Sequence, residues 1–74
     1  MQSYHVTPTD NGWQLIREGA SRPARRAQTK KEMLAVVQDF MEGKTASVKI
    51  HRQDGQIQEE RTYPRRVDPT RSPG

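Results

Sequence analysis

The side chains best suited to chemistry in this sequence are cations, and they are unevenly spread. Lysine and arginine number 13 against 9 aspartates and glutamates, which gives a formal net charge of +4. The segment from Ser21 to Lys31 holds five cations and no acid: Arg22, Arg25, Arg26, Lys30 and Lys31. Excess positive charge attracts polyanions such as nucleic acids, through phosphate contacts that do not read base sequence. The segment is therefore a candidate polyanion-binding patch, and the alternative is a solvated basic surface that aids solubility.

A second group of cations lies at the C-terminal end. Residues 64–74 contain three prolines and one aliphatic residue, together with Arg65, Arg66 and Arg71. Such a composition cannot bury enough apolar surface to fold, so we expect a flexible, basic, proline-rich tail over 64–74. Arg65 and Arg66 would join the polyanion-binding residues as a second basic arm.

Other residues that could do chemistry favour structural roles. His5 and His51 are expected on outward positions of strands as surface histidines, without a carboxylate at ligand spacing, so no metal site is predicted. Glu59 and Glu60 are neighbours in a predicted strand and point to opposite faces, so they cannot flank one substrate. There is no cysteine, nucleophile elbow or phosphate-binding glycine loop. We therefore expect a protein that is not an enzyme and uses no cofactor.

The element that must organise the rest is a helix between Thr29 and Gly43. Thr29 and Glu32 form a capping box, in which each side chain bonds the other's backbone N–H, and Gly43 suits a left-handed helix end. Apolar residues recur at three- and four-residue steps and form one stripe: Met33, Val36, Val37, Phe40 and Met41. A single helix cannot bury this stripe alone, so a sheet must cover it. Phe40 is expected at the centre of the core.

Strands are predicted before the helix. Ser3–Thr7 and Gly12–Glu18 alternate apolar and polar residues, and the turn residues Asp10-Asn11-Gly12 between them indicate an antiparallel hairpin. The residues expected to face the helix are Tyr4, Val6, Trp13 and Leu15. The segment 21–28 is either an edge strand, because Pro23 cannot donate to a ladder, or a basic loop.

A second hairpin is predicted after the helix. Residues 46–51 alternate clearly, and Asp54-Gly55 is the pair typical of a two-residue type I′ turn. That loop places Arg52 opposite Ile57, Ile50 opposite Glu59 and Lys49 opposite Glu60. It also places three apolar side chains on one face of the sheet: Val48, Ile50 and Ile57.

These elements predict an α+β fold in the order β-β-β-α-β-β, with a small antiparallel sheet and one helix packed on one face. Residues 1–63 should form a single domain, because 74 residues leave no room for a second core. No apolar run approaches the roughly 20 residues of a membrane span, and no signal-peptide pattern is present, so we expect a cytoplasmic protein. So small a core would benefit from homodimer formation.

Four pieces of the sequence resemble a known family: YHVTP near the start, GWQLIREGASR, a TKKE helix and IHRQDGQIQEERTY. They look like the small bacterial proteins grouped as domain of unknown function family 2188, over roughly Ser3 to Tyr63. Arg22 to Gln28 is more basic than the family's usual strand. The resemblance implies a compact α+β domain of bacterial or phage origin, and it implies no activity.

Two functions fit these expectations. The first is a non-enzymatic binding module for nucleic acid or another polyanion, acting through the basic patch. The second is a protein–protein adaptor or inhibitor of phage or plasmid origin, using an open sheet face or an edge strand.

Overall fold

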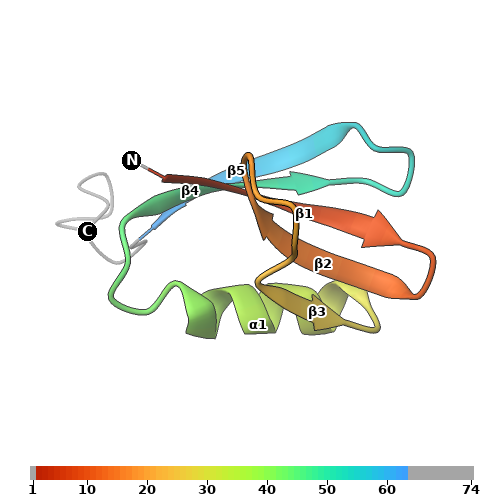
Figure 1. Cartoon of the computed structure of the whole chain (residues 1–74), viewed down its shortest axis with the longest axis horizontal. Helices are drawn as coiled ribbons and strands as arrows, with labels where there is room; N and C mark the ends of the chain where they lie inside the picture. The colour runs from red at the N-terminus through yellow and green to blue at the C-terminus, as the bar shows by residue number, and fades with distance from the viewer. Residues whose placement is uncertain (1, 64–74) are drawn as a thin grey trace, which may run out of the picture.

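The computed structural model describes residues 2–63, in which a five-stranded sheet and one helix form two layers (Figure 1). The α+β class, the element order and the single helix on one face of the sheet are confirmed. The elements are β1 (Gln2–Thr9), β2 (Gly12–Arg17), β3 (Arg25–Ala27), α1 (Lys30–Phe40), β4 (Ala46–His51) and β5 (Ile57–Tyr63). The tail 64–74 lies outside the described residues.

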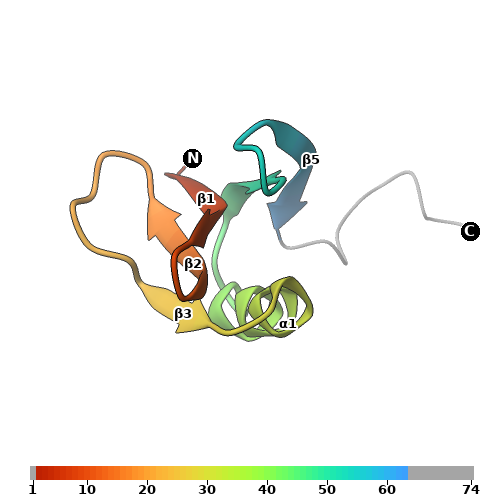
Figure 2. The ribbon, with the colours of Figure 1, turned by 90° about the vertical axis from the view of Figure 1, so that its right-hand side faces the viewer.

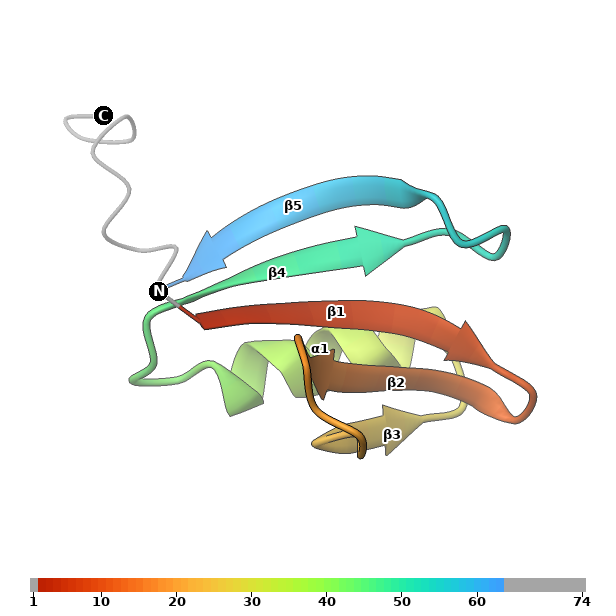
Figure 3. The same ribbon diagram turned by 45° about the horizontal axis from the view of Figure 1, so that its top comes forward.

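The strands lie in the order β3-β2-β1-β4-β5, so the N-terminal strand is central (Figure 3). The sheet is mixed, which corrects the expectation of a wholly antiparallel sheet: β1 and β4 run parallel, with Tyr4 opposite Val48 and Val6 opposite Ile50. The reason is the connection. A helix between β3 and β4 returns the chain along the sheet, so β4 enters in the direction of β1 and β3.

The uncertain segment before the helix forms an edge strand. β3 has only three residues and pairs with β2 alone, with Leu15 opposite Arg25 and Trp13 opposite Ala27. The N–H of Ala24 donates to the carbonyl of Leu15 at 2.7 Å and extends this ladder by one bond. Pro23 lies just before the strand, where its missing N–H interrupts no ladder bond.

The core lies between the helix and the inner face of the sheet (Figure 2). The four residues predicted to face the helix, Tyr4, Val6, Trp13 and Leu15, are all buried. The other buried apolar residues are Met33, Val37, Met41, Ala46, Val48, Ile50 and Tyr63. Ile57, which was predicted to share this face, is instead 53% exposed near the start of β5.

Phe40 does not lie at the centre of the core, and that prediction is wrong. Its ring is only partly buried and packs edge-on against Tyr4, with the two ring centroids 5.6 Å apart. The fully buried line is formed by Met33 and Val37 of the helix and by its C-cap residue Met41, spaced four residues apart. The sheet therefore contacts one side of the predicted apolar stripe, and Phe40 lies at the edge of the core.

The second hairpin has most of the predicted register, but with a different turn and a bulge. The Gly55 N–H donates to the Arg52 carbonyl at 2.9 Å, and only Gly55 has positive φ in this loop, which excludes a type I′ turn. The loop has three residues, and His51 rather than Arg52 lies opposite Ile57. A bulge then leaves Gln58 as an extra residue, so Ile50 faces Glu59 and Lys49 faces Glu60 as predicted.

Gly12 should be the glycine least tolerant of a side chain. At its φ of +146°, a Cβ would lie 2.4 Å from the Ala27 carbonyl oxygen, whereas at Gly43, with φ of +77°, it would meet nothing within 4 Å. Gly43→Ala should cost about 1–2 kcal/mol, the penalty for a left-handed residue. Gly12→Ala should cost about 1–3 kcal/mol more, because the crowded neighbour is backbone. Urea unfolding of the two variants measures this, and equal losses would contradict the close approach of β3 to Gly12.

The loss of stability caused by substitutions in and beside the helix should increase with the burial of the side chain that is removed. Met33→Ala should cost about 2–5 kcal/mol, because a fully buried side chain is lost and a cavity remains. Thr29→Ala should cost about 1 kcal/mol, since it removes one cap bond. Phe40→Ala should cost less than Met33→Ala, because its ring is only partly buried. Unfolding free energies from urea titration give the order. A larger loss for Phe40→Ala than for Met33→Ala would show that Phe40 is a central core residue.

Candidate functional site

The five cations of the predicted basic patch lie in and around β3 and at the start of α1, but they do not share one face or one edge of the sheet, since Lys30 donates to Gln58 of β5. Arg25 lies opposite Leu15 and Arg26 opposite Gln14, so these two neighbours project to opposite faces of the sheet. Arg22 lies in the loop before β3, while Lys30 and Lys31 begin the helix. Arg65 and Arg66 lie outside the described residues.

Two of the five cations lie over aromatic rings. The Arg25 guanidinium lies 4.9 Å from the centroid of Phe40, and Lys44 lies over the same ring at 4.5 Å. The Lys30 ammonium lies 5.2 Å from the centroid of Trp13 and donates to the Gln58 side chain. Each such pair is worth about 0.5–1 kcal/mol at an exposed site. Arg25 and Lys30 therefore have packing roles in addition to their charge.

The other three cations, Arg22, Arg26 and Lys31, are exposed, as Arg25 also is. Within residues 2–63, none of the five cations of the patch forms an ion pair with a carboxylate. The β4–β5 half of the sheet differs, because its cations are paired: Lys49 with Glu60, Arg52 with Asp54 and Arg61 with Glu59. Positive charge is therefore unneutralised at the β3 edge and balanced at the β5 edge.

The start of the helix is already provided with negative charge. The Thr29 hydroxyl accepts from the Glu32 N–H at 3.1 Å, as predicted, but the Glu32 carboxylate accepts from the Gln28 N–H at 3.3 Å and not from Thr29. This carboxylate in the first turn opposes the positive end of the helix dipole. A phosphate would therefore bind to the exposed side chains more readily than to the helix end.

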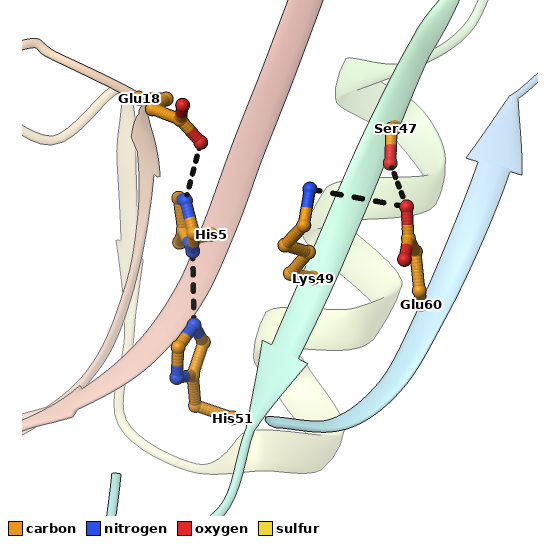
Figure 4. Close-up of polar contacts among 6 residues, drawn as sticks. All are labelled: His5, Glu18, Ser47, Lys49, His51 and Glu60. Atoms are coloured by element: carbon orange, nitrogen blue, oxygen red, sulfur yellow. Dashed lines mark hydrogen bonds and ion pairs between the residues drawn. The ribbon is translucent and has the colours of Figure 1, made fainter. Parts of the chain in front are cut away.

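A second polar cluster lies on the face of the sheet opposite the helix (Figure 4). His5 and His51 contact each other, with His5 Nδ1 and His51 Nε2 2.9 Å apart. The remaining nitrogen of each ring also has a partner: His5 Nε2 lies 3.0 Å from the Glu18 carboxylate, and His51 Nδ1 lies 2.8 Å from the Gly55 carbonyl oxygen. Both histidines are on outward positions as predicted, but their contact was not foreseen.

Three pieces of the fold assemble this cluster. Parallel pairing of β1 with β4 places His5 opposite Lys49 and therefore diagonally beside His51. The Glu18 N–H donates to the Ser3 carbonyl at 2.8 Å and continues the β1–β2 ladder, which brings its carboxylate to His5. No local sequence signal identifies these neighbours, because the parallel pairing joins segments on either side of the helix.

The two glutamates of β5 point to opposite faces, as predicted. On the helix side, Glu59 accepts a 2.8 Å hydrogen bond from Arg61. This bond, with a smaller effect of Tyr63, raises the pKa of Arg61, so its guanidinium remains charged. On the open side, Glu60 accepts from the Ser47 hydroxyl at 2.7 Å and lies 3.8 Å from Lys49 (Figure 4). Each carboxylate thus has a hydrogen-bond partner within the sheet.

Residues 2–63 contain no group of three or more histidine, cysteine or acidic side chains placed to hold a metal ion. Among the same residues, no helix has the length and apolar character that crossing a membrane requires.

A family model described as "Uncharacterized protein conserved in bacteria (DUF2188)" matches residues 4–63, which cover all five strands and the helix except the first two residues of β1. Neither the curated proteins nor the solved structures give a match.

Proposed function

This chain belongs to the DUF2188 family of bacterial proteins, and because that family supplies no activity, we propose a function from the geometry. The protein is a small non-enzymatic binding module for nucleic acid or another polyanion, and it binds through the basic edge formed by β3 and the start of α1. The contacts come from Arg22, Arg25, Arg26, Lys30 and Lys31, with Arg65 and Arg66 as a second arm. We place it in the bacterial cytoplasm, where nucleic acid is abundant.

One observation carries this proposal: the unequal pairing of charge across the sheet. The cations of β4, β5 and the loop between them face carboxylates within 4 Å, while those at the β3 edge do not. A cation without a carboxylate partner keeps its full attraction for phosphate. Arg25 and Lys30 lie over aromatic rings, so the other three exposed cations of the patch, Arg22, Arg26 and Lys31, are the expected phosphate contacts.

The arrangement favours binding without sequence preference. Arg25 and Arg26 belong to a three-residue edge strand, and Lys31 to the first turn of a helix that packs on the sheet. Neither element projects from the domain, as a helix or strand must do to enter a groove of a nucleic acid. Affinity should therefore depend on phosphate charge and fall steeply with salt.

Removal of exposed cations from the patch should weaken nucleic-acid binding, whereas removal of the same number of cations elsewhere should not. We expect the triple variant Arg22→Gln, Arg26→Gln, Lys31→Gln to weaken binding to labelled RNA and DNA in fluorescence anisotropy at low salt. The slope of log affinity against log salt should also fall by about 0.7–0.9 for each contact removed. All three side chains are exposed, so the variant should fold, which circular dichroism checks.

The matched control removes the same three charges from the opposite half of the sheet: Lys49→Gln, Arg52→Gln and Arg61→Gln. It should bind nearly as well as the unmodified chain. Equal weakening by both triple variants would mean that only net charge matters. Absence of binding at low salt, or binding indifferent to salt, would leave the arginines of β3 with the role of charged groups that protect a sheet edge from other strands.

A second function, a protein–protein adaptor or inhibitor, is favoured by the other edge of the sheet. β5 has seven residues, and within residues 2–63 no strand pairs with its outer side. Ile57 adds an exposed apolar side chain there. Such an edge can accept a strand from another protein or from a second copy of this chain.

Capture from a bacterial lysate separates the two functions. Partners of the polyanion binder should disappear when the lysate is treated with nuclease, because nucleic acid bridges them to the bait. A partner of the adaptor should persist in stoichiometric amount and should be lost when Thr62 is replaced by proline, which removes a backbone donor from β5. Nuclease-sensitive capture alone would contradict the adaptor, and nuclease-resistant capture alone would contradict the polyanion binder.

A further inference from the structure

The outer edge of β5 carries backbone hydrogen-bonding groups that no strand of the described residues uses. β5 forms one end of the sheet, opposite the end formed by β3, and within residues 2–63 it pairs with β4 alone (Figure 3). It has seven residues, whereas β3 at the other end has three. A long strand edge is a template for pairing with another chain. The described part of the structure thus leaves one long edge open to a further strand.

The register of the sheet determines which backbone groups of β5 point away from β4. The Arg52 N–H donates to the Gln56 carbonyl at 2.7 Å, so Arg52 turns its backbone toward the β5 side. Because backbone direction alternates along a strand, Val48 turns the same way, and Arg61, which lies opposite Val48, turns its backbone toward β4. The N–H and C=O of Glu60, the neighbour of Arg61, therefore point outward from the sheet.

Glu60 is also the middle residue of β5, which runs from Ile57 to Tyr63. A second copy that pairs antiparallel across a two-fold axis at Glu60 would overlap the whole of this strand. The outward backbone groups of the two axial residues would then bond to each other. We propose that the protein forms a homodimer in this register, in which two five-stranded sheets join edge to edge through β5.

The charged side chains of β5 are arranged to fit this register. Glu59 and Arg61 lie on either side of the axis, so each Glu59 would lie opposite Arg61 of the partner subunit, on the helix side of the sheet. Within one chain the two side chains are already paired, with Arg61 Nε 2.8 Å from the Glu59 carboxylate. The dimer would therefore contain four alternating charges, in which each guanidinium lies between two carboxylates. The strand is complementary in charge to a second copy of itself.

The side chains at the axis oppose association and limit its strength. On the open face, Glu60 would lie opposite Glu60 of the partner subunit, and like charges directly opposite each other are destabilising. Within each chain, the Lys49 ammonium lies 3.8 Å from this carboxylate and the Ser47 hydroxyl donates to it at 2.7 Å, which offsets part of the repulsion. We therefore expect a weak dimer that is populated at high micromolar concentration.

Assembly through β5 should stop at two copies. The contact is isologous, because the same edge is used by both subunits, and it leaves β3 at both ends of the joined sheet. β3 is short and follows closely after Pro23, so it is a poor template for a third copy. The dimer is independent of polyanion binding, and it assigns to a second copy the edge that the adaptor would offer to another protein.

Sedimentation velocity of the full chain, from low to high micromolar concentration, measures the dimer. We expect a monomer–dimer equilibrium that shifts toward monomer as salt screens the four charges. Glu59→Arg alone and Arg61→Glu alone should each weaken the dimer, because like charges then lie opposite each other. An equimolar mixture of the two variants should associate as a heterodimer, because opposite charges face each other again. Both variants lose the pair within the chain, so a role confined to one chain predicts no recovery on mixing.

The residue at the axis provides a gain-of-function test. Glu60→Gln should strengthen the dimer about 2- to 5-fold, because it removes the facing carboxylates. Glu18→Gln makes the same chemical change on the same face, away from β5, and should leave the dimer unchanged. Circular dichroism checks that each variant folds. A chain that stays monomeric at high micromolar concentration, charge-swapped variants that do not associate when mixed, or a dimer unaffected by Glu60→Gln would overturn this interface, whatever the anisotropy titrations with nucleic acid show.

Discussion

The parallel pairing of β1 with β4 is the constraint on which the rest of this structure depends. β1 hydrogen-bonds to β2 on one side and to β4 on the other, so it joins an N-terminal three-stranded piece to a C-terminal hairpin. Val6 and Ile50 lie side by side in this pairing, and both are fully buried. Without it, the helix would pack on the first three strands alone, and Val48 and Ile50 would remain in water. A domain this small has little other apolar surface to bury in their place.

The same pairing determines what each face of the sheet can do. Because side chains alternate along a strand, the register that buries Tyr4 and Val6 must also bring His5 toward His51 on the other face. The open face therefore becomes polar and ordered, with hydrogen bonds that cross between strands. At the β3 edge the alternation divides the arginines instead. Arg25 covers Phe40, while Arg26 remains in solvent.

Local features of the sequence predicted most of the fold. Four predictions that depend on neighbours in sequence were correct. They are the helix start at Thr29, the period-two strands, the inward-facing residues such as Val6 and Leu15, and the pairing of Lys49 with Glu60. Of the predicted basic residues, Arg25 and Arg26 lie in the edge strand β3 and project to opposite faces, while Lys30 reaches Gln58 of β5. Alternation alone, however, cannot specify which strands become neighbours, so the parallel pair and its histidine cluster could not be predicted.

The errors have equally specific causes. An apolar stripe of five residues is wider than the line of contact with the sheet, so periodicity alone could not choose between Phe40 and Met33. Asp54-Gly55 suits both a type I′ turn and a type I turn followed by a left-handed glycine, and the sequence does not separate them. The bulge at Gln58 then restored the register, so the prediction for Ile50 and Glu59 was correct although the turn was not.

The central position of the N-terminal strand has a consequence for how this protein folds during synthesis. β1 leaves the ribosome before the other four strands, yet its second edge stays unpaired until β4, which places Ile50 opposite Val6, has been made. Until then, a nascent chain of three strands and a helix displays an open strand edge flanked by apolar side chains, which favours pairing with other chains. Contacts so distant in sequence also slow folding relative to a helical protein of equal length. Arrest of translation within β4 should therefore yield an aggregation-prone intermediate and not a smaller stable domain.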